Sequence, residues 1–228
     1  MKNFTIHTQQ DLEDAVNALG FLPFFENSVP GFSVEEHVDR ACWWHGTSGE
    51  GFWPVWEWKG PVVQKIGCAY GKFFEHKAAF VSAEWFPDFA NYRRDGYDMD
   101  ARYDDGLAAK KDLELWETVR DGGPLLTQEL KVAAGYGKGG KKGFETVITR
   151  LQAQCYVTIA DFVYRTDKHG NRFGWGVSQY DTPENQFGKP FCDAVYKREP
   201  EESLEKLLAH FHKLLPDASD AALRKFLN

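Results

Sequence analysis

The sequence lacks the features that would place the chain in a membrane or in an oxidising compartment. No run in its 228 residues approaches the roughly 18 consecutive apolar residues of a membrane span. The N-terminus turns polar and acidic at once, which is not typical of a signal peptide. The cysteines are widely separated and form no CxxC pair: Cys42, Cys68, Cys155 and Cys192. We therefore expect a cytoplasmic protein with reduced thiols and no membrane contact.

Motifs for metals, nucleotides and covalent catalysis are also missing. His37, Cys42 and His45 lie close together, but their spacing fits no closed four-ligand zinc pattern. A GxGxxG string at 135–140 is not followed by the alternating strands and helices of a dinucleotide site. The order of residues supports no Ser-His-Asp or Cys-His arrangement. We expect neither a metal nor a cofactor.

Positive charge is scarce, whereas aromatic residues are abundant. The net charge is −7, so any surface for nucleic acid has to be a local patch. Aromatic residues make up 15% of the chain, and six of the eight tryptophans fall between positions 43 and 85. Either these rings pack in the core, or some form an aromatic pocket that stacks on an extruded base. The candidates for the pocket are Trp43, Trp44, Trp56, Trp58 and Trp85.

The helix and strand signals predict an α+β protein in three stretches. Residues 96–182 are the clearest, with helices expected near 106–120, 125–133 and 144–154. Two β-rich runs then flank the polar tip TDKHGN at 166–171, which predicts a hairpin. Three short helices followed by a hairpin are typical of a winged helix, in which the hairpin is the wing.

The flanking stretches are less regular. In residues 1–95, Thr8 with Asp11 predicts the start of a first helix and Gly20 its end. Further helix signals lie at 33–43 and 54–65, the latter interrupted at Gly60-Pro61, and a hairpin is expected at 69–82. They predict a second winged-helix-like unit in tandem with the first, and an unrelated α+β cap is the alternative. Residues 183–228 contain an irregular part and two helices, which either complete the core or carry a dimer interface. The sequence indicates no oligomeric state.

Four phrases of this chain resemble the AlkZ-related family, which is a group of bacterial winged-helix proteins akin to the AlkZ and YcaQ DNA glycosylases. The phrases are PGFSVEEH (30–37), AYGKFF (69–74), SAEWFPDFANYRRDGYD (82–98) and GYGKGGKKGFETVITRLQAQ (135–154). The resemblance implies binding of duplex DNA and a role in DNA repair. If the likeness extends to the glycosylases themselves, it also implies hydrolysis of an N-glycosidic bond.

The glycosylases carry a Gln–apolar–Gln or Gln–apolar–Asp signature whose side chains hold the attacking water. The matching residues here are Gln152 and Gln154, on either side of Ala153. The resemblance therefore makes them candidates for catalysis. The alternative is a helix end that happens to contain two glutamines.

Residues 136–172 form a basic stretch within this acidic protein, with seven lysines and arginines against three carboxylates. On a winged helix they would lie before the recognition helix, on that helix and at the wing tip, where phosphates and base edges are contacted. The candidates for DNA binding are Lys138, Lys141, Lys142, Thr146, Thr149, Arg150, Arg165, Lys168 and Arg172. The alternative is a solvated loop on a non-catalytic module that binds a protein partner or a small ligand in the aromatic pocket.

Overall fold

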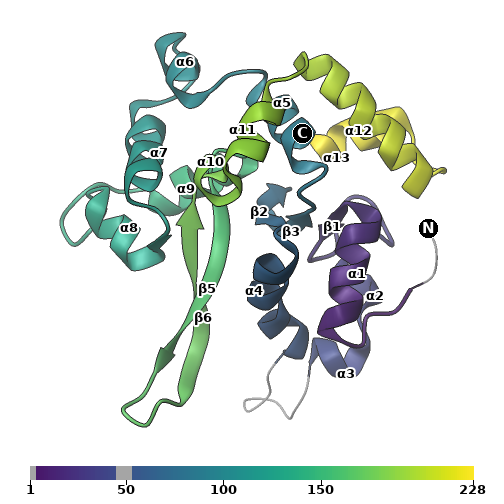
Figure 1. Cartoon of the computed structure of the whole chain (residues 1–228), viewed down its shortest axis with the longest axis horizontal. Helices are drawn as coiled ribbons and strands as arrows, with labels where there is room; N and C mark the ends of the chain where they lie inside the picture. The colour runs from purple at the N-terminus through teal and green to yellow at the C-terminus, as the bar shows by residue number, and fades with distance from the viewer. Residues whose placement is uncertain (1–3, 45–52) are drawn as a thin grey trace.

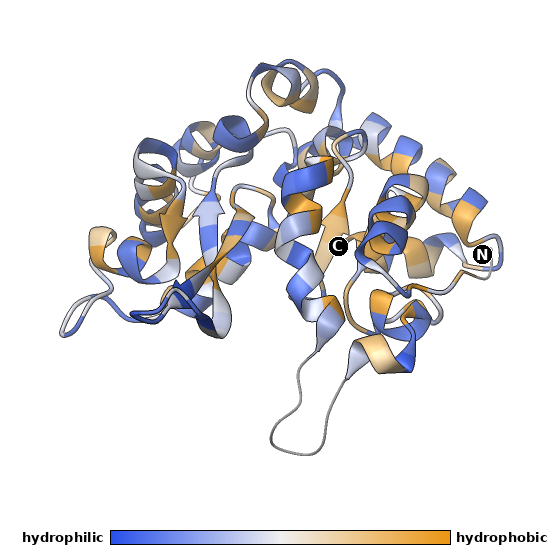
Figure 2. Cartoon of the chain, turned by 60° about the horizontal axis from the view of Figure 1, so that its bottom comes forward, coloured by the Kyte–Doolittle hydropathy of each residue, from blue (hydrophilic) through white to orange (hydrophobic). Residues whose placement is uncertain are grey.

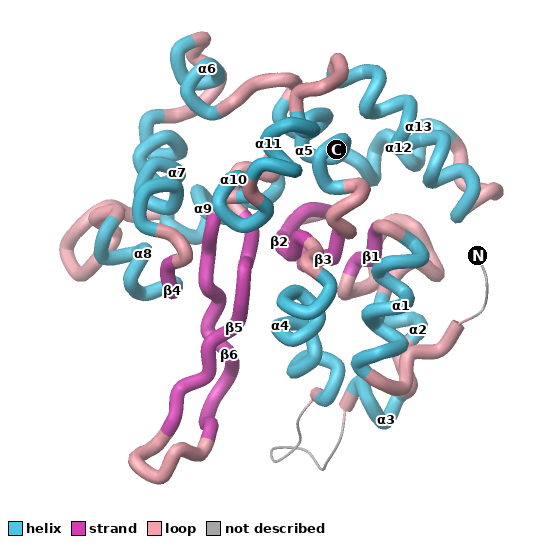
Figure 3. Tube along the Cα trace, viewed as in Figure 1, coloured by secondary structure: helices cyan, strands magenta, loops and turns pink. Residues whose placement is uncertain are grey.

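The computed structural model describes residues 4–44 and 53–228, so His45 lies outside the described residues. The fold is α+β, with two small antiparallel sheets among helices (Figures 1 and 3). Each sheet belongs to one of two units with a similar order of elements: a helix, a short strand, further helices and a hairpin. We call them the N-terminal unit, residues 9–81, and the middle unit, residues 110–181.

The N-terminal unit places a helix and a short strand before further helices and a hairpin. Thr8 caps the first helix through a reciprocal capping box with Asp11, and Gly20 ends it, as the sequence predicts. The short strand pairs with the second strand of the hairpin, which gives the sheet order β1-β3-β2. The elements are α1 (Gln9–Leu19), β1 (Phe21–Pro23), α2 (Val34–His37), α3 (Arg40–Trp43), α4 (Pro54–Ile66), β2 (Ala69–Phe74) and β3 (Lys77–Val81).

The middle unit repeats this order, and its sheet has the matching order β4-β6-β5. Its β4 has only two residues, and the sequence analysis missed it. Before the unit lies α6 (Met99–Asp104), capped by Asp98. The elements of the unit are α7 (Lys110–Gly122), β4 (Leu125–Leu126), α8 (Thr127–Ala133), α9 (Phe144–Ala153), β5 (Thr158–Thr166) and β6 (Arg172–Asp181).

Helices outside the two units hold them together. Buried Arg94, at the end of α5, donates hydrogen bonds to Glu184 Oε1 (2.6 Å), the Tyr196 hydroxyl (2.8 Å) and the Cys155 carbonyl (2.8 Å). Phe226 of α13 stacks on Phe74 of β2 at 4.4 Å between ring centroids, so the C-terminal helices complete the core. These helices are α5 (Phe86–Arg94), α10 (Pro183–Phe187), α11 (Lys189–Val195), α12 (Pro200–Leu214) and α13 (Asp220–Leu227).

The two units also touch directly. Tyr70 of β2 meets Phe162 of β5 edge to face, with 5.6 Å between centroids. The β5–β6 hairpin runs alongside α4 and projects beyond the rest of its unit (Figure 1). Hydrophobic residues face inward on the helices, whereas the end of this hairpin is hydrophilic (Figure 2). The hairpin end is therefore the most exposed part of the middle unit's sheet.

Three predicted boundaries are wrong. The helix at 54–66 runs through Pro61 without interruption, and buried residues on both sides of the proline hold it against the core. The helix expected at 33–43 is divided into α2 and α3 at Val38, whose backbone is extended. The segment after 183, expected to be irregular, forms α10 and α11.

Candidate nucleic-acid interface

The outer end of the β5–β6 hairpin carries three exposed cations, Arg165, Lys168 and Arg172. None of them forms an ion pair with another residue of the described chain. The Asp167 carboxylate instead accepts hydrogen bonds from the backbone N–H groups of His169 and Asn171, which lower its pKa and order the tip. The three cations thus keep their charge available to an external anion.

The cations around the start of α9 fall into two groups. Lys141 is paired with Glu114 Oε2 at 2.6 Å, and Arg150 donates from Nε to the buried carboxylate of Asp112 at 3.0 Å. The Asp112 carboxylate raises the pKa of Arg150, and the lysine lowers the pKa of Glu114. These pairs fasten α9 and its preceding loop to α7. The other two cations, Lys138 and Lys142, are exposed and form no ion pair within the described residues.

The second half of α9 rests on β2 of the N-terminal unit. Gln152 is fully buried; its Nε2 donates to the Ile148 carbonyl (3.1 Å) and its Oε1 accepts from the backbone N–H of Lys72 (3.2 Å). Thr149 Oγ1 accepts from Lys72 Nζ at 3.3 Å. Only the first half of the helix, which includes Thr146, is open to solvent.

The two glutamines of the candidate catalytic triplet therefore have different surroundings. Both the nitrogen and the oxygen of the Gln152 carboxamide form hydrogen bonds with backbone groups. Gln154 is half-buried at the C-cap of α9. The hydrogen bonds of Gln152 make it a bridge between the two units. A role in positioning water stays a prediction for both residues.

The structure brings together part of the predicted aromatic pocket. Trp43 stacks on Trp53 with 5.7 Å between centroids and an interplanar angle of 16°, and Trp44 and Trp56 approach the same ring at 6.0 and 6.1 Å. Trp175 reaches Trp53 from β6, at 6.3 Å. Trp53 and Trp175 are not among the five predicted pocket residues, although Trp53 belongs to the same tryptophan-rich stretch. Trp175 lies far from the tryptophan-rich stretch in the chain, so no local signal could have found it.

The remaining two pocket candidates lie elsewhere. Trp58 is two residues from Trp56 on α4, and helical geometry directs the two side chains to different sides. Trp85 stacks on His210 of α12 at 4.0 Å, with Lys206 above it at 4.9 Å. The five candidate tryptophans therefore do not form one pocket.

A buried amine lies where α4 meets β5. Lys59 Nζ is 3.3 Å from the centroid of the Trp56 ring and 4.3 Å from that of Phe162. Burial lowers the pKa of Lys59 to about 7, against a smaller opposing effect of Glu57. The two ring faces compensate part of the cost of burying a cation. Lys59 belongs to the core-facing side of α4 and is not among the residues predicted from the sequence to form a site.

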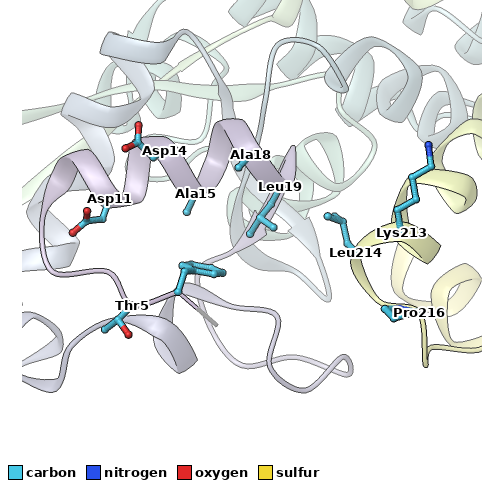
Figure 4. A pocket seen from close by; sticks show the side chains of 10 residues that line it. Thr5, Asp11, Asp14, Ala15, Ala18, Leu19, Lys213, Leu214 and Pro216 are labelled. Carbon is cyan, nitrogen blue, oxygen red and sulfur yellow. The ribbon is translucent and has the colours of Figure 1, made fainter. Parts of the chain in front are cut away.

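Two cavities flank α4 and α1. One of about 460 Å³ lies between α4 and the hairpin, and its lining includes Glu57, Phe162, Tyr164 and Arg172. Burial and the Glu57 carboxylate raise the pKa of Tyr164. The other, of about 770 Å³, lies between α1 and the end of α12, on the far side of α4 from the hairpin (Figures 1 and 4).

The α1–α12 cavity is mainly apolar. Leu19 and Leu214 line it from opposite sides, and Asp11 and Asp14 point outward from α1 (Figure 4). The cations of the hairpin have no part in it. Of these two cavities, the one beside the hairpin combines aromatic rings with an unpaired arginine.

Across residues 4–44 and 53–228, no three metal-ligating side chains gather as a metal site would require. None of the helices described is both long and apolar enough to span a membrane.

One comparison with known protein families gives a match. A family model described as AlkZ related matches residues 6–228, which is nearly the whole sequence. Searches of curated proteins and of solved structures found no match.

Proposed function

Because the chain belongs to the AlkZ-related family, we propose that it is a winged-helix protein that binds duplex DNA and is related to the alkylpurine and crosslink DNA glycosylases. The order α7, β4, α8, α9, β5, β6, with β4 paired to β6, supports a winged helix in the middle unit. The matching order of the N-terminal unit supports a tandem pair. Domains of 1–95, 96–182 and 183–228 follow from this proposal.

The observation that carries DNA binding is the projecting hairpin with its three unpaired cations, Arg165, Lys168 and Arg172. An unpaired surface cation releases counterions from DNA when it contacts a phosphate, which favours binding. A cation already paired with a carboxylate contributes less to the free energy of binding, because that ion pair has to be broken first. Together with Lys138 and Lys142, the surface supports three to five phosphate contacts. Such a surface gives a slope of log K against log salt of about −2.7 to −4.5.

Fluorescence anisotropy of a labelled 20-base-pair duplex tests this proposal. The triple variant Arg165→Glu, Lys168→Glu, Arg172→Glu is expected to lose affinity on the order of 100-fold at low salt, because three phosphate contacts become repulsions. A matched control reverses three exposed cations outside the hairpin: Lys197→Glu, Lys213→Glu and Lys225→Glu. It has the same net charge and should keep most of the affinity. Equal losses in both variants would contradict a specific role of the hairpin.

We extend the proposal to base excision on the strength of the triplet Gln152-Ala153-Gln154. Since the Gln152 carboxamide is bound to backbone groups, Gln154 has the freer side chain for holding a water. Incubation with alkylated duplex DNA, followed by chromatography of released bases, tests this step. We expect release by the unmodified protein and none by Gln154→Ala. If the unmodified protein releases no base, the function is binding alone.

A second candidate function is a non-catalytic module that binds a protein partner or a small ligand. The observation in its favour is the ring cluster around Trp53, together with a net charge of −7. This candidate predicts no salt-dependent binding of DNA. Absence of binding to the duplex at low salt would therefore favour it over the first.

A further inference from the structure

Trp175 is an unusual residue to find on the surface. Its side chain is 58% exposed. Burial of a tryptophan side chain usually contributes strongly to the stability of a protein, so a tryptophan left exposed calls for an explanation. Trp44, the C-cap of α3, is also exposed and meets the ring of Trp53 at 6.0 Å, as Trp175 does at 6.3 Å, and Val163 is exposed on β5 of the hairpin. Exposed apolar side chains that gather in one place mark a binding surface.

The ring of Trp175 packs against a cluster of other tryptophans. It approaches Trp53 at 6.3 Å and 59°, and Trp53 is itself stacked on Trp43 and packed edge to face on Trp56. Trp53 is the N-cap of α4 and so belongs to the N-terminal unit. The exposed ring therefore bridges the two units.

The backbone beside Trp175 is shaped for aromatic rings. A Cβ atom at Gly176 would lie 2.9 Å from Cζ of Tyr164, so only glycine lets that ring lie across the strand. The guanidinium of Arg172 lies 5.2 Å from the centroid of the same Tyr164 ring. The exposed indole of Trp175 and the unpaired cation of Arg172 are thus three residues apart on β6 of this hairpin.

We propose that Trp175 is a stacking platform for an unpaired base, and that DNA with unpaired bases binds more tightly than a fully paired duplex. This inference rests on the proposed DNA binding by the hairpin. Nucleic acid with unpaired bases offers both partners that the surface needs: phosphates for Arg165, Lys168 and Arg172, and an uncovered base face for the indole. In a paired duplex, the neighbouring base pairs cover both faces of each base.

The experiment compares two labelled DNAs by anisotropy at one salt concentration: a 20-base-pair duplex and the same duplex with a bulge of three unpaired thymidines. We expect the bulged DNA to bind about 5-fold to 100-fold more tightly, which is the effect of stacking one base on an aromatic side chain. Trp175→Leu keeps an apolar side chain but lacks a π face, so it should remove the preference. Trp175→Phe should retain part of it. Affinity for the paired duplex should change less than twofold in both variants.

The outcomes separate this inference from the proposed function. Equal affinity of the unmodified protein for both DNAs would overturn the stacking platform and leave duplex binding intact. A preference that survives in Trp175→Leu, or an equal loss for both DNAs in that variant, would also overturn it. If the unmodified protein binds neither DNA, both the inference and the proposed function fail. Unfolding curves of the two variants verify that each is folded.

Discussion

The two hairpins of the chain occupy equivalent places in the topology but have opposite environments. The β2–β3 hairpin is short, turns through Glu75 and His76 in left-handed conformations, and buries most of its side chains. The β5–β6 hairpin is longer, and only its base is buried, at Thr158, Ile159 and Tyr180. The same arrangement of strands thus serves as core in one unit and as a projecting surface in the other.

The difference follows from what covers each hairpin. β2 lies under α9 on one side, and its Phe74 packs against Phe89 of α5 and Phe226 of α13. Among the described elements, the outer half of β5–β6 lies beside α4, with a cavity between them. Aromatic side chains therefore dominate the first hairpin, and charged ones the end of the second. Topology alone does not determine which hairpin contacts a ligand.

Truncation of one aromatic residue on each hairpin should show the largest contrast. Phe80 of β3 is fully buried and packs on Tyr70 at 4.7 Å, so Phe80→Ala should lower the free energy of unfolding by about 3–5 kcal/mol. Trp175→Ala on the exposed hairpin should cost less than about 1 kcal/mol. Urea unfolding measures both. Similar losses in the two variants would show that the β5–β6 hairpin is as much a part of the core as β2–β3.

Lys59 lies between the two units, and its substitution should change how stability depends on pH. Its folded pKa is about 7, whereas the unfolded value is about 10.4. Between these values the unfolded chain binds a proton that the folded chain does not hold, so this residue makes stability rise with pH from about 7 to about 10. Below pH 7 its contribution is constant.

Lys59→Met removes that titration. Relative to the variant, the unmodified protein should gain roughly 2.5 kcal/mol between pH 7.5 and pH 9.5. The measurement is the free energy of unfolding of both proteins at the two pH values, with Lys225→Met, at an exposed site, as control. If the free energies of unfolding of the unmodified protein and of Lys59→Met differ by the same amount at both pH values, the low pKa of Lys59 is contradicted.

A smaller effect is expected at the contact between α9 and β2. Gln152→Leu leaves the backbone N–H of Lys72 without its acceptor in a partly buried place, which should lower the free energy of unfolding by about 1–2 kcal/mol. Gln154→Leu, two residues away and half-buried, should change stability by less than about 0.5 kcal/mol. Chemical denaturation of both variants measures these changes in the free energy of unfolding. Equal effects would mean that Gln152 does not join the units.

Local signals predicted much of the secondary structure. Thr8 with Asp11 and Gly20 mark the ends of α1, and the polar tip after Thr166 marks the long hairpin, because caps and turns depend on neighbouring residues. The two-residue β4 was missed because a strand of this length has no alternating pattern. α4 was predicted to break at Pro61, yet tertiary packing overrides that signal.

The site was harder to predict, because it depends on pairs that are distant in the chain. Nothing near Lys141 or Arg150 indicates that each meets a carboxylate of α7, 27 and 38 residues earlier. Likewise, the buried position of Gln152 depends on Lys72 of the other unit. Exposed cations at a hairpin tip could be predicted from the local sequence, whereas ion pairs and aromatic contacts between units could not.

The docking of α9 on β2 has a consequence for how this protein would choose its sites on a genome. With Gln152 buried and Thr149 bonded to Lys72, only the first turns of α9 can approach base edges in a major groove. If the proposed DNA binding holds, base readout by this helix is confined to the few exposed side chains of those turns, such as Thr146, and the shape of the DNA supplies the rest of the selectivity. A protein of this kind would respond more to distorted places in DNA than to a long, fixed order of bases.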